Sequence, residues 1–378
     1  YFIPPGLTKV PLCVKIMSKG VDSMKAIDEI DKNLKIEKTI DRDDIEFFDA
    51  KTDGFALFGL PFTNEKRFLR MPDEAGTAIN EGVATLYANT SGGRVIFETD
   101  SPYIAIRAIM PSICHFSHMP LTGCSGFDLF LDDGDGFSYN GSFVPPYDMT
   151  NGYESILIRS TERKLRRVMI NFPLYNDVDQ LYIGLQQGSV HNPVNPYKAL
   201  APIYYYGSSI TQGGCASRPG NNYPAIISRK NNIDFVCLGF SGSARGEAAM
   251  AEYIADRDMS VFVMDYDHNA PDAEDLERHH HPFYEIIRRK KPELPIVMVT
   301  APAPPYMRES FAESRRSVIL ESFKKARANG DKNVYFIDGC SFFASGESDI
   351  TTVDGTHPTD YGFSRMAEEI LKTLNRLV

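Results

Sequence analysis

Short apolar runs alternate with longer amphipathic segments in the second half of the chain. The runs predict buried strands at Ile203–Tyr206, Phe235–Leu238, Val261–Met264, Ile296–Thr300 and Val334–Ile337. Helical periodicity predicts helices at about 222–230, 246–256, 274–291, 309–329 and 360–376. Strands that alternate with helices indicate βαβ units. The pattern therefore predicts a parallel sheet with helices on both faces.

The pattern is different between about Ile45 and Ile170, where apolar and polar residues alternate over short stretches. The stretches with this alternation are Arg94–Thr99, Tyr103–Arg107, Gly126–Leu131, Ser155–Arg159 and Arg167–Phe172. Turn signals rich in Gly, Asp and Asn separate them, as in Asp132–Gly136. Short alternating strands at this spacing predict an antiparallel β-sandwich or jelly roll.

These changes of pattern divide the chain into three parts. Residues 1–42 include a highly charged stretch and are predicted to be an N-terminal extension or edge segment. Residues 43–195 form the predicted β-sandwich domain, and residues 196–378 form the predicted α/β domain. The proline-containing polar stretch Gly188–Pro196 marks the boundary between them. A length of 378 residues also favours two domains.

Charge and composition narrow the classes of partner. The formal net charge of −10 argues against a nucleic acid or an anionic membrane as the main partner. The chain has no uninterrupted apolar run of about 18 residues, so no transmembrane helix is predicted. None of the six cysteines has CxxC spacing, which removes the usual zinc and thioredoxin motifs. Low cysteine density favours a cytoplasmic protein, and secretion after loss of an earlier signal stays open.

Four polar blocks follow predicted strands of the α/β domain. They are Gly207–Thr211 after the first strand, Leu238–Gly242 after the second, Asp267–Asn269 after the third and Asp354–His357 after the fifth. The carboxyl ends of parallel strands share one edge of the sheet, where open α/β folds bind their ligands. We therefore expect the four blocks to meet at that edge.

The blocks contain the groups that ester hydrolysis requires. Ser209 is the predicted nucleophile, and the adjacent Ser208 is the alternative. His357 is the predicted base, and Asp354 lies three residues before it, where its carboxylate can orient the ring. A main-chain carbonyl is the alternative orienting group. This chemistry requires no metal and no cofactor.

Three donors are predicted for the developing oxyanion: the backbone N–H groups of Ser209 and Gly242 and the side-chain amide of Asn269. Each of the last two has a structural alternative. Gly242 also suits a tight turn, and Asn269 also suits a helix N-cap.

The four blocks resemble those of the SGNH, or GDSL-like, hydrolases, which are named for Ser, Gly, Asn and His in separate blocks. These positions fall in order on Ser209, Gly242, Asn269 and His357, with Asp354 at the aspartate of the last block. In one branch of that superfamily the hydrolase follows a β-domain with a Gly-x-Asp-Leu-Tyr motif. Gly126–Phe130 is similar to that motif, with Phe130 in place of tyrosine. The resemblance implies a flavodoxin-like sheet preceded by this β-domain.

The chain departs from the family pattern at two places. Ser208 replaces the aspartate of the usual Gly-Asp-Ser. The third block reads Asp267-His268-Asn269-Ala270 where Gly-x-Asn-Asp is usual. Asn269 is still the best match, and we expect Asp267 and His268 to modify the site.

The resemblance implies a serine esterase that acts on acetylated carbohydrates such as xylo-oligosaccharides. A lipid esterase or thioesterase with the same triad is one alternative, and a non-catalytic glycan-binding protein is another. The β-domain is expected to cover the active site or to form a homo-oligomer interface, and glycan binding is its third possible role.

Other polar clusters have simpler interpretations. The consecutive histidines His279–His281 point in different directions on a helix, so a solvated helix surface is predicted rather than a metal site. His115 and His118 lack a third ligand in the sequence, so core or surface roles are predicted. Asp132–Gly136 is predicted to be a hairpin turn, because a calcium loop counted from Asp133 would need a glutamate where Val144 stands.

Overall fold

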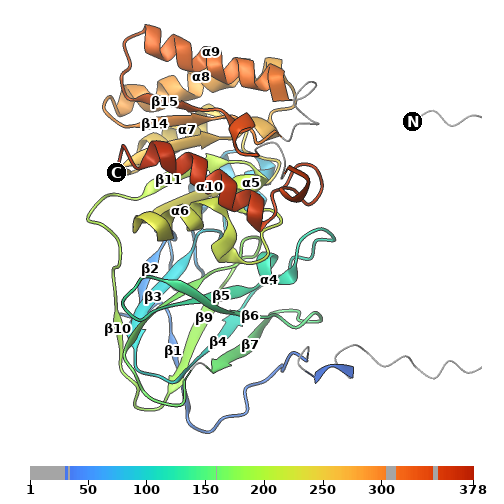
Figure 1. Ribbon diagram of the computed structural model, residues 1–378, viewed down its shortest axis with the longest axis vertical. Helices are drawn as coiled ribbons and strands as arrows, with labels where there is room; N and C mark the ends of the chain where they lie inside the picture. The colour runs from blue at the N-terminus through green and yellow to red at the C-terminus, as the bar shows by residue number, and fades with distance from the viewer. Residues whose placement is uncertain (1–29, 33–34, 159, 304–311, 344–347) are drawn as a thin grey trace, which may run out of the picture. The chain divides into compact units, whose positions relative to one another are not determined.

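The computed structural model describes residues 30–32, 35–158, 160–303, 312–343 and 348–378 (Figure 1). The contacts divide the chain into two compact units, Tyr1–Ile36 and Glu37–Val378. All the features below belong to the second unit. Most of the predicted extension 1–42 lies outside the described residues, and the proposed boundary between residues 195 and 196 stays a prediction.

Two antiparallel sheets form the β-domain. The first sheet has the strand order β1-β9-β4-β7, which are Ile45–Asp49, Gln180–Gln186, Tyr103–Ile109 and Gly152–Ile158. The second has the order β10-β3-β8-β5-β6, which are His191–Pro193, Arg94–Thr99, Arg166–Asn171, Phe127–Asp132 and Ser138–Phe143. Strand β2 (Ala56–Phe58) also pairs with β3. Both sheets bury alternate residues in a shared core, such as Val95 of β3 and Ile106 of β4. The predicted antiparallel domain is confirmed.

The predicted linker contains a strand. His191–Pro193 pairs antiparallel with β3 at the edge of the second sheet. Proline is tolerated on an edge strand because its missing N–H can face away from the ladder. Three short helices in the β-domain also had no clear signal in the sequence: α2 (Asp73–Ala78), α3 (Glu81–Leu86) and α4 (Leu121–Cys124).

Five parallel strands form the sheet of the α/β domain, in the order β12-β11-β13-β14-β15. Their bounds are Phe235–Gly239, Ile203–Gly207, Val261–Asp265, Ile296–Val299 and Val334–Ile337. The order 2-1-3-4-5 is that of flavodoxin-like folds, whose ligands bind where the chain leaves the first strand and the sheet changes direction. Here that position is the end of β11, at Gly207.

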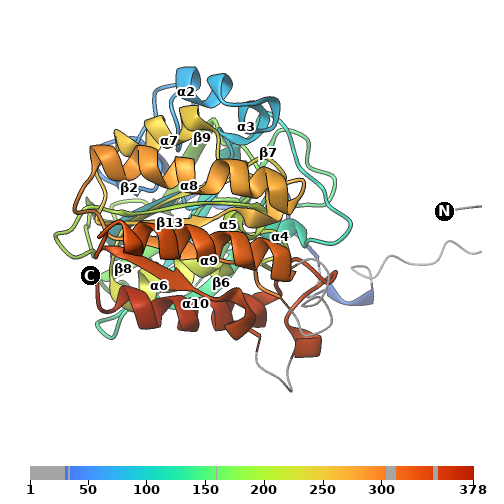
Figure 2. The same cartoon turned by 90° about the horizontal axis from the view of Figure 1, so that it is seen from above.

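Helices cover both faces of this sheet (Figure 2). Their bounds are Ser209–Gln212 (α5), Tyr223–Asn231 (α6), Ala248–Ala255 (α7), Ala273–Lys290 (α8), Glu313–Ala328 (α9) and Asp360–Leu374 (α10). Tyr204 and Tyr206 pack in one core with α7, α8 and α9. Ile203 and Tyr205 pack in the other core with α6 and α10. Burial of successive residues on opposite faces explains the uninterrupted apolar runs. In the described part of the chain, no helix combines the length and the apolar character that crossing a bilayer requires.

Helix α8 corrects the interpretation of the three consecutive histidines. His280 and His281 are buried, and the Nδ1 atom of each lies near Ser322 Oγ of α9, at 3.0 and 3.1 Å. His279 is the more exposed of the three and contacts the Asp275 carbonyl through Nδ1 at 2.8 Å. The prediction of a solvated surface is therefore wrong for two of the three residues, because α9 packs over them.

The β-domain contacts the α/β domain at the edge strand β12. The guanidinium of the fully buried Arg70 donates to the carbonyls of Cys237 and Gly239, at 2.8 and 2.9 Å. Arg94 forms a salt bridge with Asp234, which lies just before β12. These contacts hold the strand whose carboxyl end carries the second polar block.

The aspartate of the Gly-Phe-Asp-Leu-Phe segment makes a second connection. Asp128 is fully buried, and its Oδ2 accepts hydrogen bonds from the Gly220 backbone at 2.8 Å and from Arg218 at 3.2 Å. Asn171 donates to its Oδ1 at 2.7 Å. The motif therefore anchors the loop between α5 and α6 to the β-domain.

Candidate active site

The turn from β11 into α5 places Ser209 at the start of a short helix. Ser208 is the N-cap, and its hydroxyl oxygen accepts a hydrogen bond from the Ile210 backbone at 3.2 Å. Ser208 is 1% exposed, whereas Ser209 is only partly buried. Gly213 ends the helix with φ of 106°, a left-handed conformation that suits glycine. Of the two adjacent serines, Ser209 is the one whose hydroxyl is accessible.

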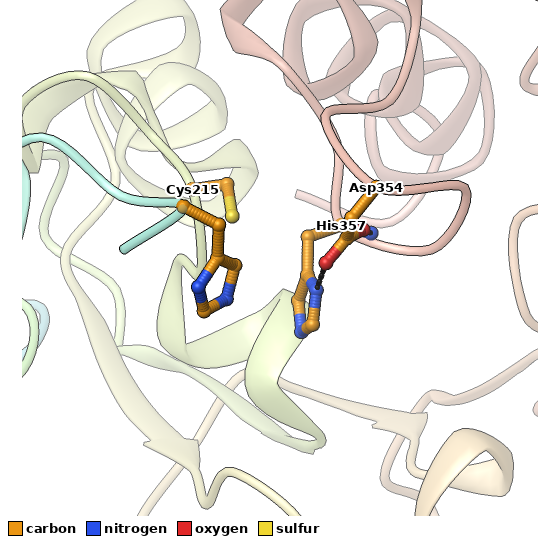
Figure 3. Close-up of side chains that lie close together, drawn as sticks. Cys215, Asp354 and His357 are labelled. Carbon is orange, nitrogen blue, oxygen red and sulfur yellow. Dashed lines mark hydrogen bonds and ion pairs between the residues drawn. The ribbon is translucent and has the colours of Figure 1, made fainter. Parts of the chain in front are cut away.

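A chain of hydrogen bonds connects Ser209 with His357 and Asp354. Ser209 Oγ lies 2.9 Å from His357 Nε2, and His357 Nδ1 lies 2.7 Å from Asp354 Oδ2. Figure 3 shows Asp354 and His357 on the loop that leads to α10, with the contact between them dashed. In other enzymes this is the arrangement by which a histidine removes the proton of a serine.

The carboxylate of Asp354 is held in its charged form. Its Oδ1 also accepts the backbone N–H groups of Thr356 at 3.0 Å and His357 at 2.8 Å. Partial burial opposes ionisation, but the hydrogen bonds from His357 and Thr356 outweigh it and lower the pKa of Asp354 to about 2. The same carboxylate therefore shapes the loop and faces the imidazole.

The predicted oxyanion donors lie on segments that follow β11, β12 and β13. The backbone N–H of Ser209 belongs to the first turn of α5, where such groups lack a partner within the helix. Gly242 is exposed and has φ of 67°, so its left-handed backbone favours glycine. The amide of Asn269 donates to the Phe240 carbonyl at 2.9 Å, and its second hydrogen remains for another acceptor. Phe240 in turn donates to the Gly207 carbonyl at 2.9 Å, which links the ends of β12 and β11.

Gln212 is a residue of the site that the sequence analysis did not single out. Its side chain is fully buried, and its Oε1 accepts the Ser241 backbone N–H at 2.9 Å. Its Nε2 donates to Asn89 Oδ1 and to the Leu174 carbonyl, both at 3.1 Å. Gln212 thus connects α5 to the segment before Gly242 and to the β-domain. Its only sequence signal is a glutamine one turn after the serine, which does not identify its partners.

A buried carboxyl group lies beneath the nucleophile helix. Asp265 Oδ2 accepts hydrogen bonds from Tyr223 at 2.9 Å and from Thr211 of α5 at 3.1 Å. Burial, and secondarily the neighbouring Asp267, raise the pKa of Asp265 to about 8. Asp265 is therefore mostly uncharged near pH 7 and anchors α5 from below.

The two predicted modifiers of the third block lie close to the site. Burial raises the pKa of Asp267 to about 6, although the Ala301 backbone donates to its Oδ2 at 2.8 Å. Burial lowers the pKa of His268 to about 4, and repulsion from His357 and Arg315 adds to this. His268 is therefore neutral near pH 7.

A small cavity of about 80 Å³ adjoins His357 and the backbone of Gly214. The β-domain contributes Phe116, His118, Met119 and Tyr175 to its wall. Tyr175 also donates to the Ser209 carbonyl at 3.3 Å. Residues of both domains therefore enclose this space. A larger cavity of about 720 Å³ lies by the carboxyl end of α8 and includes none of the four polar blocks.

Two protein-family models match successive parts of the chain. Residues 200–375 match the model of the GDSL-like Lipase/Acylhydrolase family. Residues 45–190 match the model of the N-terminus of Esterase_SGNH_hydro-type, named GxDLY. Among curated proteins, the comparison found no significant match.

Several solved structures share the whole arrangement. A protein described as a GDSL-like lipase from Bacteroides ovatus ATCC 8483 is 27% identical, with a TM-score of 0.81 over 88% of this chain and 98% of that protein. Salicylyl-acyltransferase SsfX3 from a tetracycline biosynthetic pathway is 18% identical, with a TM-score of 0.73 over 89% and 98%. An acetyl xylan esterase, Est2A, from the rumen bacterium Butyrivibrio proteoclasticus is 14% identical, with a TM-score of 0.56 over 88% and 98%. At these identities, the last two support the fold alone.

Proposed function

This chain belongs to the GDSL-like, or SGNH, hydrolases and carries their GxDLY N-terminal domain, and from that premise we propose that it is a serine esterase for short acyl esters of carbohydrates. The observation that carries the proposal is the hydrogen-bonded chain from Ser209 Oγ through His357 to Asp354, with contacts of 2.9 and 2.7 Å. Such a chain activates a hydroxyl that is otherwise a weak nucleophile.

The reaction proceeds in two steps. His357 Nε2 takes the proton of Ser209 as Oγ attacks the ester carbonyl, and the same nitrogen returns that proton to the leaving alcohol. Water then attacks the acyl-enzyme with His357 again acting as base, and the acid leaves. The Asp354 carboxylate holds the Nδ1–H tautomer and stabilises the imidazolium that forms in each step.

The backbone N–H groups of Ser209 and Gly242 and the free amide hydrogen of Asn269 stabilise the oxyanion. Hydrogen bonds hold two of these donors in place before the substrate binds. The amide of Asn269 donates to the Phe240 carbonyl, and the backbone N–H of Ser241, the residue before Gly242, donates to Gln212. Preorganised donors contribute most because they need no reorganisation during the reaction.

The size of the cavity supports a short acyl group. Its volume of about 80 Å³ is well below the roughly 300–1,000 Å³ of pockets for drug-sized ligands. An acetyl group suits this volume, whereas a fatty acyl chain needs a longer apolar channel. The carbohydrate part of the substrate rests on the architecture shared with the acetyl xylan esterase Est2A, and it is the part of the proposal that most needs testing.

The test is acetate release from acetylated xylo-oligosaccharides by the full chain, together with a series of p-nitrophenyl esters from acetate to laurate. We expect kcat/KM to be highest for the acetyl ester and to fall as the chain lengthens. A preference for long chains would establish the lipid esterase alternative instead.

Two serine variants test the nucleophile. Ser209→Ala should lower kcat by at least about 10³-fold, because the members of a triad act as a unit. Ser208→Ala is the matched control, and it should keep most activity while losing about 1 kcal/mol of stability with the helix cap. Hydrolysis that survives in Ser209→Ala would exclude this mechanism, and a wild-type protein that binds xylo-oligosaccharides without hydrolysing any ester would establish a non-catalytic glycan-binding function.

A further inference from the structure

Four side chains with metal-binding atoms converge at His357, the proposed base, and include it. His118, Cys215, Asp354 and His357 each offer one ligand atom, and all four atoms lie within 4.8 Å of one another. Figure 3 shows the labelled Cys215 on the segment after α5, opposite the loop that carries Asp354 and His357. No local sequence pattern groups them, because His118 belongs to the β-domain and is 239 positions from His357.

Cys215 is held in this place by an unusual backbone conformation. Its φ is 71°, in the left-handed region that residues with a Cβ rarely adopt. The flanking backbone is fixed on both sides, since Gly214 donates to the Ser209 carbonyl at 2.7 Å and Ala216 donates to the Gly213 carbonyl at 3.1 Å. Cys215 as a whole is only 4% exposed. A buried thiol is thus positioned beside the catalytic loop by the same turn that ends the nucleophile helix.

His118 completes the group from the other domain. Its ring centroid lies 5.6 Å from that of His357, with the ring planes inclined by 54°. The rings are therefore not stacked. His118 is exposed, so its side chain can adjust at little cost.

We propose that these four residues form an inhibitory binding site for a zinc ion, and the inhibition rests on the function proposed above. Two imidazoles, a thiolate and a carboxylate are ligand types that zinc takes in tetrahedral sites, with bonds of roughly 2.0–2.3 Å. Ligand atoms in such a site lie roughly 3.3–3.8 Å apart. The four atoms lie up to 4.8 Å apart, so the side chains must move inward for the cation to bind.

Binding of the cation removes His357 from catalysis whichever ring nitrogen it uses. At Nε2 the cation takes the electron pair that would accept the Ser209 proton. At Nδ1 it displaces the Asp354 contact and leaves the ring proton on Nε2, where the ring no longer acts as a base. The thiol of Cys215 releases its proton to solvent as sulfur binds the cation, so the exchange is Zn²⁺ for H⁺ and involves no redox step.

The experiment measures metal binding separately from activity. Cobalt(II) is titrated into the full-length Ser209→Ala protein, and the absorption spectrum is followed for a thiolate-to-cobalt charge-transfer band. Zinc is then added to displace the cobalt. We expect one equivalent to bind with a charge-transfer band. Cys215→Ala in the same background should abolish the band, and Cys340→Ala is the matched cysteine control that should keep it. Because this protein lacks the proposed nucleophile, the result does not depend on esterase activity.

Inhibition is measured in the active protein with a short p-nitrophenyl ester. Zinc should inhibit the wild type, and a chelator should restore activity. Cys215→Ala and His118→Asn should each raise the zinc concentration for half-inhibition by at least about tenfold, whereas Cys340→Ala should leave it unchanged. The proposal is overturned if the cobalt complex lacks the thiolate band, or if zinc inhibits Cys215→Ala as strongly as the wild type. A cobalt site without any esterase activity would instead overturn only the proposed function.

Discussion

The hydrolase domain and the β-domain contribute different kinds of groups to the same site. Every candidate reacting group comes from the hydrolase domain, where Ser209 follows β11 and His357 precedes α10. The β-domain supplies Tyr175 to the Ser209 carbonyl and Asn89 to Gln212. In the proposed site, chemistry and positioning are therefore divided between the domains. The β-domain contacts the site although it carries no member of the proposed triad.

The reason for this division lies in the sheet. Parallel strands bring their carboxyl ends to one edge, so a single domain can collect several reacting groups there. The loops at that edge also need partners that hold them in position. The buried Arg70 and the residues around Gln212 provide such partners from the β-domain. Four substitutions test whether the reacting groups and the positioning residues differ in their effects.

The largest effect is expected for a reacting group of the hydrolase domain. Asp354→Ala removes the carboxylate that orients His357, and we expect kcat to fall by about 10⁴-fold, as in other triads. Steady-state kinetics with an acetyl ester measures this. Asp349→Ala changes an exposed aspartate of the same region and should leave kcat unchanged. If Asp354→Ala kept more than a tenth of the activity, another group would have to orient the histidine.

A smaller loss is expected for an oxyanion donor. Asn269→Ala removes one donor to the transition state but no group that reacts, so kcat should fall by about 10²–10³-fold with little change in KM. Measuring kcat and KM separately distinguishes this from weaker substrate binding. An increase in KM at constant kcat would assign Asn269 to the binding of the ground state.

A positioning residue at the boundary of the two domains should affect both stability and rate. Gln212→Ala leaves the partly buried N–H of Ser241 and the Leu174 carbonyl without their partner. We expect a loss of about 2–3 kcal/mol in the free energy of unfolding and a fall in kcat of about tenfold. Denaturant unfolding and kinetics check the two effects. Gln187→Ala changes an exposed glutamine of the β-domain and should change neither. If Gln212→Ala were less stable but kept its kcat, Gln212 would contribute to stability and not to catalysis.

The last prediction concerns the pH dependence of stability, through the buried carboxyl group of Asp265 beneath α5. The pKa of Asp265 is raised to about 8 from the ordinary value of 3.8, so between these values the folded protein binds a proton that the unfolded chain releases. The contribution of this group to stability is therefore complete below about pH 4 and is lost as the pH rises to about 8, by at most about 1.4 kcal/mol per pH unit. Relative to Asp265→Asn, which cannot ionise, the wild type should become less stable over this range. Urea unfolding at several pH values measures the difference, and a constant difference would show that Asp265 is ionised in the folded protein.

Much of the hydrolase domain could be predicted from its sequence. Strands buried on both faces give continuous apolar runs, so β11 was located to within one residue at its end. The four polar blocks were found because each follows such a run. Strand β10 was missed, because a short edge strand with a proline has the composition of a linker. His280 and His281 were assigned to the surface because the sequence of α8 does not show that α9 covers them.

The linear sequence was enough to propose which residues react and the order in which they follow the strands. It pointed to Ser209 in a polar block directly after a strand, and to His357 and Asp354 in a block before the last helix. Only the tertiary structure decided what surrounds them. Gln212, Cys215 and His118 obtain their neighbours from segments far apart in the chain, and those contacts depend on how two domains pack, which no local pattern of apolar and polar residues records.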